Sequence, residues 1–222
     1  MKKFLALSVI ALTATASAQT FSTQPFELGL TGGYAGGLSG EVFVHAPFIS
    51  GPFGIKAGVS YARPTALFNE NGSFGVITYG EAKRLVEASG EQVREAGSNV
   101  VIGVDGTYSL GELAPGLDAS VYAGGRYGLF NRSVSFGAET TTYTSNTFGI
   151  GAGVMASYPL SGNVSLVGDL GVDHFFDAAV TTSNADGTYS VNPGEAGYSD
   201  TRNLVNFPGT YFKARVGFKF MF

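Results

Sequence analysis

Eight stretches of the chain alternate apolar residues with polar or small ones at a period of two, the spacing of a β-strand with one apolar face. The opposite faces carry glycine, serine and charged side chains. After residue 18 no apolar run approaches the roughly 18 residues of a membrane-spanning helix, so the pattern excludes a helical membrane protein. The predicted strands cover residues 26–34, 41–48, 53–61, 100–110, 117–129, 148–160, 164–176 and 211–222.

The connections between these strands alternate between short and long. The stretches "ISG", "GELAPG" and "SGN" are tight, whereas residues 62–99, 130–147 and 177–211 are long and polar, and only the short "AGGLSG" after the first strand breaks the rule. An even number of strands, short periplasmic turns and long outer loops are typical of outer-membrane barrels. The sequence therefore predicts an all-β fold, an eight-stranded antiparallel up-and-down transmembrane β-barrel with both termini in the periplasm. Ten strands are the alternative, if "SFGVITYG" and "SVSFGAETTTY" are separate membrane strands and not extensions of hairpins above the bilayer.

Aromatic residues on the apolar faces support the membrane interpretation. Within a strand they are eight to ten residues apart, which spans roughly 20–25 Å at the usual rise and tilt, the height of the apolar band of such barrels. The sequence predicts a periplasmic girdle of Phe26, Phe48, Phe53, Tyr108, Tyr158 and Phe222, and an outer girdle of Tyr34, Tyr61, Tyr127, Phe148, Phe176 and Phe212.

The first 18 residues have the features of a secretory signal peptide. A basic tip at Lys2 and Lys3 precedes an apolar stretch and the small-residue box Ala16-Ser17-Ala18, which predicts cleavage before Gln19. We expect residues 19–222 to form the barrel. Loss of the two lysines leaves 11 Lys and Arg against 17 Asp and Glu, a net charge near −6, so nucleic acid is not an expected partner. The chain has no cysteine, which excludes disulfides and thiolate metal sites.

The last strand alternates apolar residues up to the final residue of the sequence. Phe218, Phe220 and Phe222 resemble the C-terminal signature of outer-membrane barrel proteins, which in that family is read by the barrel assembly machinery. The chain from residue 19 onward resembles small OmpA/OmpX-type eight-stranded barrels. The resemblance implies the outer membrane of a bacterial cell, with its lipid and the assembly machinery as partners. Because the sequence ends with this strand, we expect no cell-wall-binding domain of the OmpA type.

Ionisable residues of both signs lie on the inward faces of the predicted strands. Alignment of Phe176 with Phe212 predicts that Arg215 faces Asp173 and that Lys219 faces Asp169, and the same alignment places Lys56 near His45 and within reach of Asp105. Because eight strands leave room for little but side chains, we interpret these groups as charge pairs that fill the lumen; a proton or solute path is the alternative. The predicted lumen network is Glu27, His45, Lys56, Asp105, Asp118, Arg126, Asp169, Asp173, Lys213, Arg215 and Lys219.

No catalytic, metal or cofactor site is expected. In "DHFFD", strand alternation points Asp173 and Asp177 inward and His174 outward, so the three do not converge on a metal, and His174 is predicted to belong to a girdle. Some eight-stranded outer-membrane barrels are lipid-modifying enzymes with a rim histidine and a serine or acid. Neither histidine of this sequence has a serine at a suitable spacing.

One helix-like segment interrupts the β pattern. Residues Tyr79–Ser98 set apolar positions among charges, with Gly90 as an interruption, and Leu85, Val86 and Val93 are candidates for contact with a partner above the barrel mouth. The leading hypothesis is therefore a non-enzymatic integral outer-membrane protein with an envelope-structural or surface-interaction role through its outer loops. A narrow porin-like channel for small solutes or ions is the alternative, and a lipid-modifying enzyme comes third.

Overall fold

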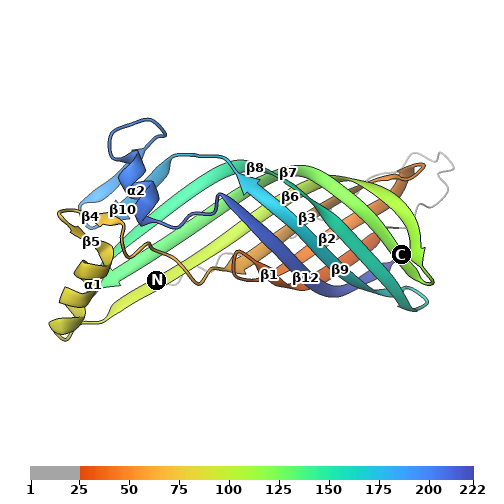
Figure 1. Cartoon of the computed structure of the whole chain (residues 1–222), viewed down its shortest axis with the longest axis horizontal. Helices are drawn as coiled ribbons and strands as arrows, with labels where there is room; N and C mark the ends of the chain where they lie inside the picture. Colours follow the sequence, from red (N-terminus) through yellow and green to blue (C-terminus); the bar gives the residue numbers. More distant parts are fainter. Residues whose placement is uncertain (1–25) are drawn as a thin grey trace, which may run out of the picture.

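The computed structural model describes residues 26–222, and the predicted signal peptide lies outside them. Eight antiparallel strands form a closed barrel, in which each strand pairs with the next along the chain and β12 pairs with β1 (Figure 1). This confirms the predicted fold class. The strands are β1 (Glu27–Ala35), β2 (Leu38–Ser50), β3 (Phe53–Arg63), β6 (Val93–Ala114), β7 (Leu117–Phe136), β8 (Glu139–Ser161), β9 (Val164–Phe175) and β12 (Thr210–Met221).

The two ends of the barrel differ in how the strands are joined. At one end, which we call the turn end, two residues join β2 to β3, β6 to β7 and β8 to β9. The opposite end, the head end, carries the long connections. There β4 (Ser73–Phe74) and β5 (Ile77–Thr78) form a separate two-stranded hairpin, and α1 (Tyr79–Ala88), β10 (Val180–Asn184), β11 (Gly187–Val191) and α2 (Tyr198–Leu204) follow.

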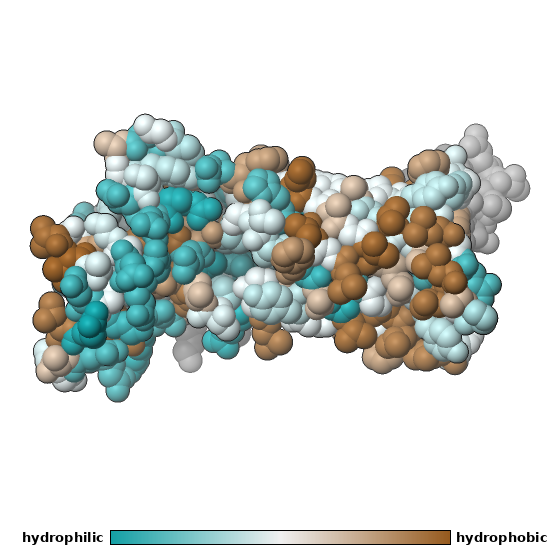
Figure 2. Space-filling model, in the orientation of Figure 1, coloured by the Kyte–Doolittle hydropathy of each residue, from teal (hydrophilic) through white to brown (hydrophobic). Residues whose placement is uncertain are grey.

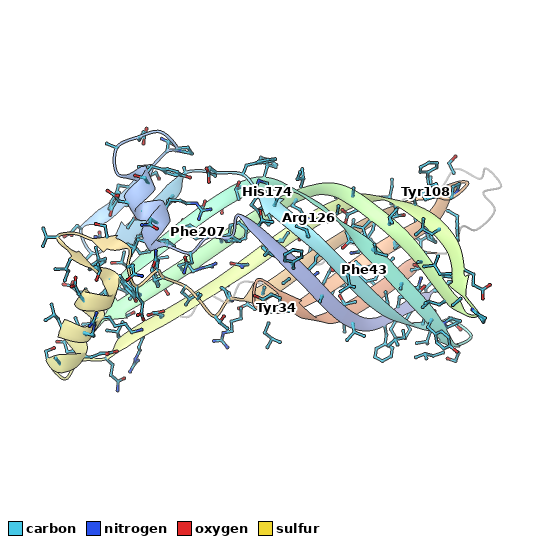
Figure 3. All side chains as sticks on the ribbon, viewed as in Figure 1. Tyr34, Phe43, Tyr108, Arg126, His174 and Phe207 are labelled. Atoms are coloured by element: carbon cyan, nitrogen blue, oxygen red, sulfur yellow. The ribbon has the colours of Figure 1, made fainter. Side chains whose placement is uncertain are left out.

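The lipid-facing surface has the predicted alternation. Eleven of the twelve predicted girdle aromatics are exposed, and Tyr127 is half-buried. In Figure 3 Tyr34 and His174 lie toward the head end and Tyr108 lies at the turn end, and Figure 2 shows hydrophobic side chains gathered over the turn-end half of the molecule. In residues 26–222 each helix is too short or too polar to span a membrane.

Three strands extend well beyond the rest of the barrel. β6, β7 and β8 have 22, 20 and 23 residues, whereas the other five barrel strands have 9 to 13. The predicted loop at 130–147 is therefore wrong, because β7 and β8 stay paired up to Phe136 and Glu139. The prediction failed because polar residues cover one face of this hairpin. The ten-strand alternative is also wrong: "SVSFGAETTTY" forms the tip of this hairpin, and "SFGVITYG" holds β4, β5 and the first turn of α1.

The head has a hydrophobic core of its own. We define the head as the projecting parts of β6, β7 and β8 together with residues 64–92 and 176–209. Its buried residues form one hydrophobic cluster, which reaches into the adjoining barrel through Val101 of β6 and Phe175 of β9 and has the composition of a soluble core. They are Leu67, Phe68, Tyr79, Val101, Phe130, Val134, Tyr143, Phe175, Val180, Tyr198, Leu204, Val205 and Phe207.

The helix-like segment is shorter than predicted. α1 begins with a capping box, in which Thr78 and Glu81 bond to each other's backbone N–H groups, and it ends at Ala88. Gly90 adopts a φ of 86°, which breaks the helix, and Val93 already belongs to β6. The prediction of one segment to Ser98 is therefore wrong after Ala88.

Candidate functional site

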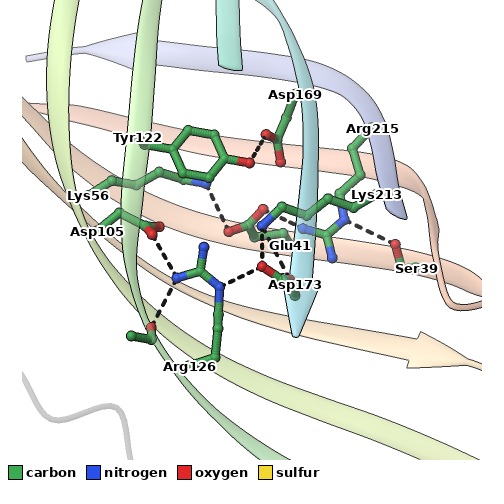
Figure 4. Close-up of polar contacts among 11 residues, drawn as sticks. Ser39, Glu41, Lys56, Asp105, Tyr122, Arg126, Asp169, Asp173, Lys213 and Arg215 are labelled. Carbon is green, nitrogen blue, oxygen red and sulfur yellow. Dashed lines mark hydrogen bonds and ion pairs between the residues drawn. The ribbon is translucent and has the colours of Figure 1, made fainter. Parts of the chain in front are cut away.

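The middle of the lumen holds a buried network of four acidic and four basic side chains, so its formal charges cancel (Figure 4). Arg126 on β7 joins two of the acids: Nη1 donates to Asp105 at 2.7 Å and Nε donates to Asp173 at 2.9 Å. Lys213 on β12 donates to the same Asp173 at 3.0 Å. The eight residues are Glu41, Asp105, Asp169, Asp173, Lys56, Arg126, Lys213 and Arg215.

Glu41 on β2 is the second junction of this network. It lies 3.1 Å from the Lys56 ammonium and accepts a hydrogen bond from Arg215 Nη1 at 2.6 Å, while Arg215 Nε donates to Ser39. The sequence prediction missed Glu41. Strand alternation could have found it, because Glu41 is an even number of residues from His45 and therefore on the same inward face.

The predicted pairs of β12 with β9 are wrong. Arg215 lies opposite Asp169 in the ladder, and Lys219 lies opposite Ser165, so the observed register differs from the predicted one by four residues. Alignment of Phe176 with Phe212 assumed that residues at one membrane height are also ladder neighbours. In a tilted, staggered barrel they are not. Lys219 instead donates to Glu27 of β1 at 2.6 Å.

The other predicted proximity fits the register. Lys56 lies opposite His45 on β2 and opposite Asp105 on β6. Its ammonium group nevertheless pairs with Glu41, and Asp105 pairs with Arg126.

A small apolar layer borders the network on the side of the turn end. It consists of Phe43, Tyr122, Met155 and Val167. The Lys56 Nζ lies 4.8 Å from the centroid of the Phe43 ring and 5.0 Å from that of Tyr122, so the cation contacts two ring faces. The Tyr122 hydroxyl donates to Asp169. Tyr122 was also missed, although it shares the inward face with Arg126.

An aromatic layer covers the network on the side of the head end. Phe130 and Phe175 meet edge to face with their centroids 4.9 Å apart, and Phe175 stacks on Tyr211 at 5.9 Å. Above them Arg132 lies 5.4 Å from the Phe207 ring. Burial lowers the pKa of Arg132 to about 10, so it remains a cation at neutral pH.

Arg132 also ties the head to the barrel. Its Nη1 donates to the side chain of Asn99 at 2.8 Å, and its Nη2 donates to the carbonyl of Asn206 at 3.1 Å. One side chain of β7 thus holds β6 and the segment before β12 together.

A cavity of about 220 Å³ opens at the turn end of the lumen. His45 lies on its wall, with Nδ1 2.7 Å from Glu27 and Nε2 3.0 Å from the Thr107 hydroxyl. Of the predicted network residues, Asp118 lines this cavity but is exposed, and Lys219 is half-buried there. The other nine predicted residues are buried.

The order Thr107–His45–Glu27 matches the hydrogen-bond order of a hydrolase triad, but the surroundings do not favour that chemistry. The backbone of β6 around Thr107 is paired with β3 on one side and β7 on the other. Its N–H groups are therefore used in the ladders and do not form an oxyanion hole.

The "DHFFD" stretch does not form a metal site. His174 points outward, as predicted, and its Nδ1 lies 2.7 Å from the Thr210 hydroxyl. Asp177, predicted to point inward, is exposed beyond the end of β9 and lies 3.6 Å from Arg202. Among residues 26–222 no three His, Asp or Glu side chains are grouped so that they could hold a metal ion.

The predicted contact residues of the head differ in exposure. Leu85 is 64% exposed, but Val86 is half-buried and Val93 packs against the head core, so these two are poor candidates for an outside contact. Val76, between β4 and β5, is fully exposed and was missed. At the turn end Phe218, Phe220 and Phe222 are all exposed toward the lipid-facing side, and their role in assembly stays a prediction.

Comparison with solved structures finds similar barrels. The major outer membrane protein of Thermus thermophilus is 31% identical, with a TM-score of 0.80, and the match covers 89% of this chain and 99% of that one. Neisserial surface protein A is 13% identical, with a TM-score of 0.39 and coverage of 89% and 95%. CarO of Acinetobacter baumannii is 11% identical, with a TM-score of 0.39 and coverage of 90% and 97%. No protein-family model and no curated protein matches the sequence.

Proposed function

This chain belongs to the family of small outer-membrane β-barrel proteins that includes the major outer membrane protein of Thermus thermophilus, and on that premise we propose that it is a non-conducting, non-enzymatic barrel that presents its head at the cell surface. Its location is the bacterial outer membrane, as predicted. In the proposed orientation the turn end faces the periplasm and the head end faces outward.

The single observation that carries the proposal is the filled lumen. The neutral network around Arg126 lies between the apolar layer at Phe43 and the aromatic layer at Phe130, so buried side chains occupy successive levels of the barrel (Figures 3 and 4). Movement of a hydrated solute would require several buried ion pairs to separate at once, and each separated pair costs several kcal/mol. This arrangement supports an anchor more than a pore.

Planar-bilayer recording of the purified protein tests this step. We expect no stable conductance, whereas a general porin recorded in the same bilayers supplies the positive control. A narrow channel is the second candidate, because the cavity beside His45 opens into the lumen from the turn end. Reproducible, stable current steps would favour that candidate and would contradict the anchor.

The surface role is supported by the exposed tip of the head. Val76 and Leu85 are large apolar side chains held in solvent by a packed and capped structure, which favours contact with an envelope component or an external surface. A tag inserted at Glu91 should be reachable from outside intact cells. Inaccessibility of that tag would reverse the proposed orientation.

Crosslinking in intact envelopes tests the contact itself. We expect the double variant V76S/L85S to lose a crosslinked partner that the wild type and the control variant R94S retain, because Arg94 is exposed on the neighbouring β6. Identical crosslinks in all three proteins would remove the tip from the proposal.

A further inference from the structure

The projecting sheet has a second face, opposite the head core, that is built almost entirely from uncharged hydroxyl and amide side chains. On β7 and β8 the residues Val134 and Tyr143 belong to the core. Their strand neighbours Ser133, Thr142 and Thr144 therefore point to the other side. We call this side the hydroxyl face.

The ladders align these side chains into rows across four strands. The first row crosses β7, β8, β10 and β11 through Asn131, Thr144, Thr181 and Ser190. The second crosses the same strands through Ser133, Thr142, Ser183 and Thr188. Neighbouring strands lie about 4.8 Å apart and alternate residues about 7 Å apart, so the face is a regular grid of polar groups.

The grid keeps hydrogen-bonding capacity for a ligand. At its edge Thr181 pairs with Ser190 at 2.7 Å and Ser183 pairs with Thr188 at 3.0 Å. In the described part of the chain, the hydroxyls of Thr142 and Thr144 make no hydrogen bond to another protein group. A hydroxyl has one donor and two acceptor positions, and the Asn131 amide has two donors and an acceptor oxygen, so every residue of the grid can bond outward.

The hydroxyl face continues the lipid-facing surface of the barrel without a break. Tyr127 and Phe148 are ladder partners in the head-end girdle, and Asn131 and Thr144 are partners four residues further along the same two strands. At the usual strand rise and a tilt near 40°, this places the first row roughly 10 Å above the girdle and the second row roughly 15 Å above it. Both rows therefore lie above the acyl chains, at the level of the lipid headgroups and their sugars.

Charge complementarity then selects the kind of headgroup. Neither row contains a charged residue. Arg94 is the one cation near them within the described chain, on the same face but one row beyond the second, where it lies opposite Ser135 and donates to Gln92. A phosphate-rich headgroup is bound best by cations, which these rows lack. We propose that the hydroxyl face binds the neutral sugar headgroups of glycolipids in the surrounding outer leaflet.

This inference rests on the outward orientation of the proposed function, but its test does not need that orientation. The protein is reconstituted in phosphatidylcholine nanodiscs that carry a minor fraction of a neutral tetrasaccharide lipid, globotetraosylceramide, in both leaflets. The fraction of protein that retains the glycolipid after detergent release is read by native mass spectrometry. Because both leaflets carry the glycolipid, an unreachable Glu91 tag would contradict the proposed orientation alone, whereas loss of glycolipid retention would contradict the inference about the hydroxyl face.

Two matched variants test the hydroxyls. T142V/T144V replaces each hydroxyl by a methyl group and keeps the β-branched shape, whereas T142S/T144S keeps the hydroxyls. We expect the fraction of protein that retains the glycolipid to be at least roughly fivefold lower for the valine variant than for the wild type. The serine variant should retain the glycolipid as the wild type does. The variant N131A/S133A provides a second test on β7 should the valine variant fail to fold.

Three results would overturn the inference. Equal retention by the wild type and a folded valine variant would show that the hydroxyls do not bind the sugar. If the free tetrasaccharide binds to protein in plain phosphatidylcholine nanodiscs as well as the glycolipid does, the ligand is a soluble glycan and not a lipid headgroup. Selective retention of phosphatidylglycerol, added in a parallel sample, would point to phosphate instead.

Discussion

Replacement of Arg126 by alanine should destabilise the barrel more than any change at its surface. The guanidinium joins Asp105 and Asp173, and all three side chains are at most 4% exposed. In the variant Asp173 keeps Lys213, but Asp105 loses its ion-pair partner. Removal of one member of a buried pair typically costs about 3–5 kcal/mol, so we expect a loss of that size in the free energy of unfolding.

Two further variants separate charge from volume. R126M fills most of the space and should be nearly as unstable as R126A if the uncompensated charge dominates. D105N/R126A removes that charge and should recover about half of the lost stability. R94A is the control, because Arg94 is exposed and its loss should change stability by about 0.5 kcal/mol or less.

Urea unfolding in lipid vesicles measures these differences. The chain has no tryptophan, so far-UV circular dichroism and the electrophoretic shift between folded and unfolded barrel are the suitable signals. R126A within about 1 kcal/mol of the wild type would refute the view that this network holds the lumen closed. A double variant no more stable than R126A would mean that Asp105 is not the costly group.

Two predictions concern the head. The Glu81 carboxylate accepts a hydrogen bond from the Thr78 backbone N–H, and this bond lowers the pKa of Glu81. Because the pKa is lowered in the folded state, the ionised carboxylate stabilises the fold at pH values above its usual pKa near 4.3. This stabilisation is lost as the pH falls through the lowered pKa. Amide protection in α1 should therefore drop below about pH 4 in the wild type and stay constant with pH in E81Q, as read by hydrogen exchange corrected for intrinsic rates. R132A and R132K should both speed hydrogen exchange in residues 205–207, because alanine makes neither bond of Arg132 and lysine cannot reach Asn99 and Asn206 together. Both variants should shift the urea midpoint less than R126A does. Unchanged exchange in R132K would show that the positive charge alone is sufficient.

The membrane-facing half of this fold was predictable because lipid imposes a simple rule on it. Every outward position must be apolar, and the rings of residues such as Tyr34 and Tyr108 mark the two boundaries, so period-two alternation identifies both the strands and their outward faces. The same rule says nothing about strand stagger. The pairs of Arg215 and Lys219 were therefore predicted wrongly even though both side chains were placed on the correct face.

The head could not be predicted in the same way, because above the membrane the outward face of a strand is polar and the inward face is apolar. On β7 and β8 the outward face turns from Tyr127 and Phe148 to Asn131 and Thr144, and the inward face becomes apolar at Val134. The sequence prediction assumed apolar residues on the outward face throughout, and it therefore ended the two strands at residues 129 and 148, where this inversion begins. The inward apolar positions at 130, 134 and 143 were the signal that the strands continue.

The projecting sheet also explains the position of α1. Residues 93–98 of β6 pair with β7, whereas pairing with β3 begins only at Asn99, so this stretch has an edge outside the ladder. Tyr79 and Lys83 of α1 both bond to Glu95 on that edge, at 2.9 and 3.0 Å. Open strand edges promote pairing between molecules, so the helix shields the sheet while it carries the exposed Leu85. Deletion of residues 79–98 would remove this stretch of β6 together with α1 and leave the end of β7 unpaired on this side, so only point changes such as L85S separate contact from folding.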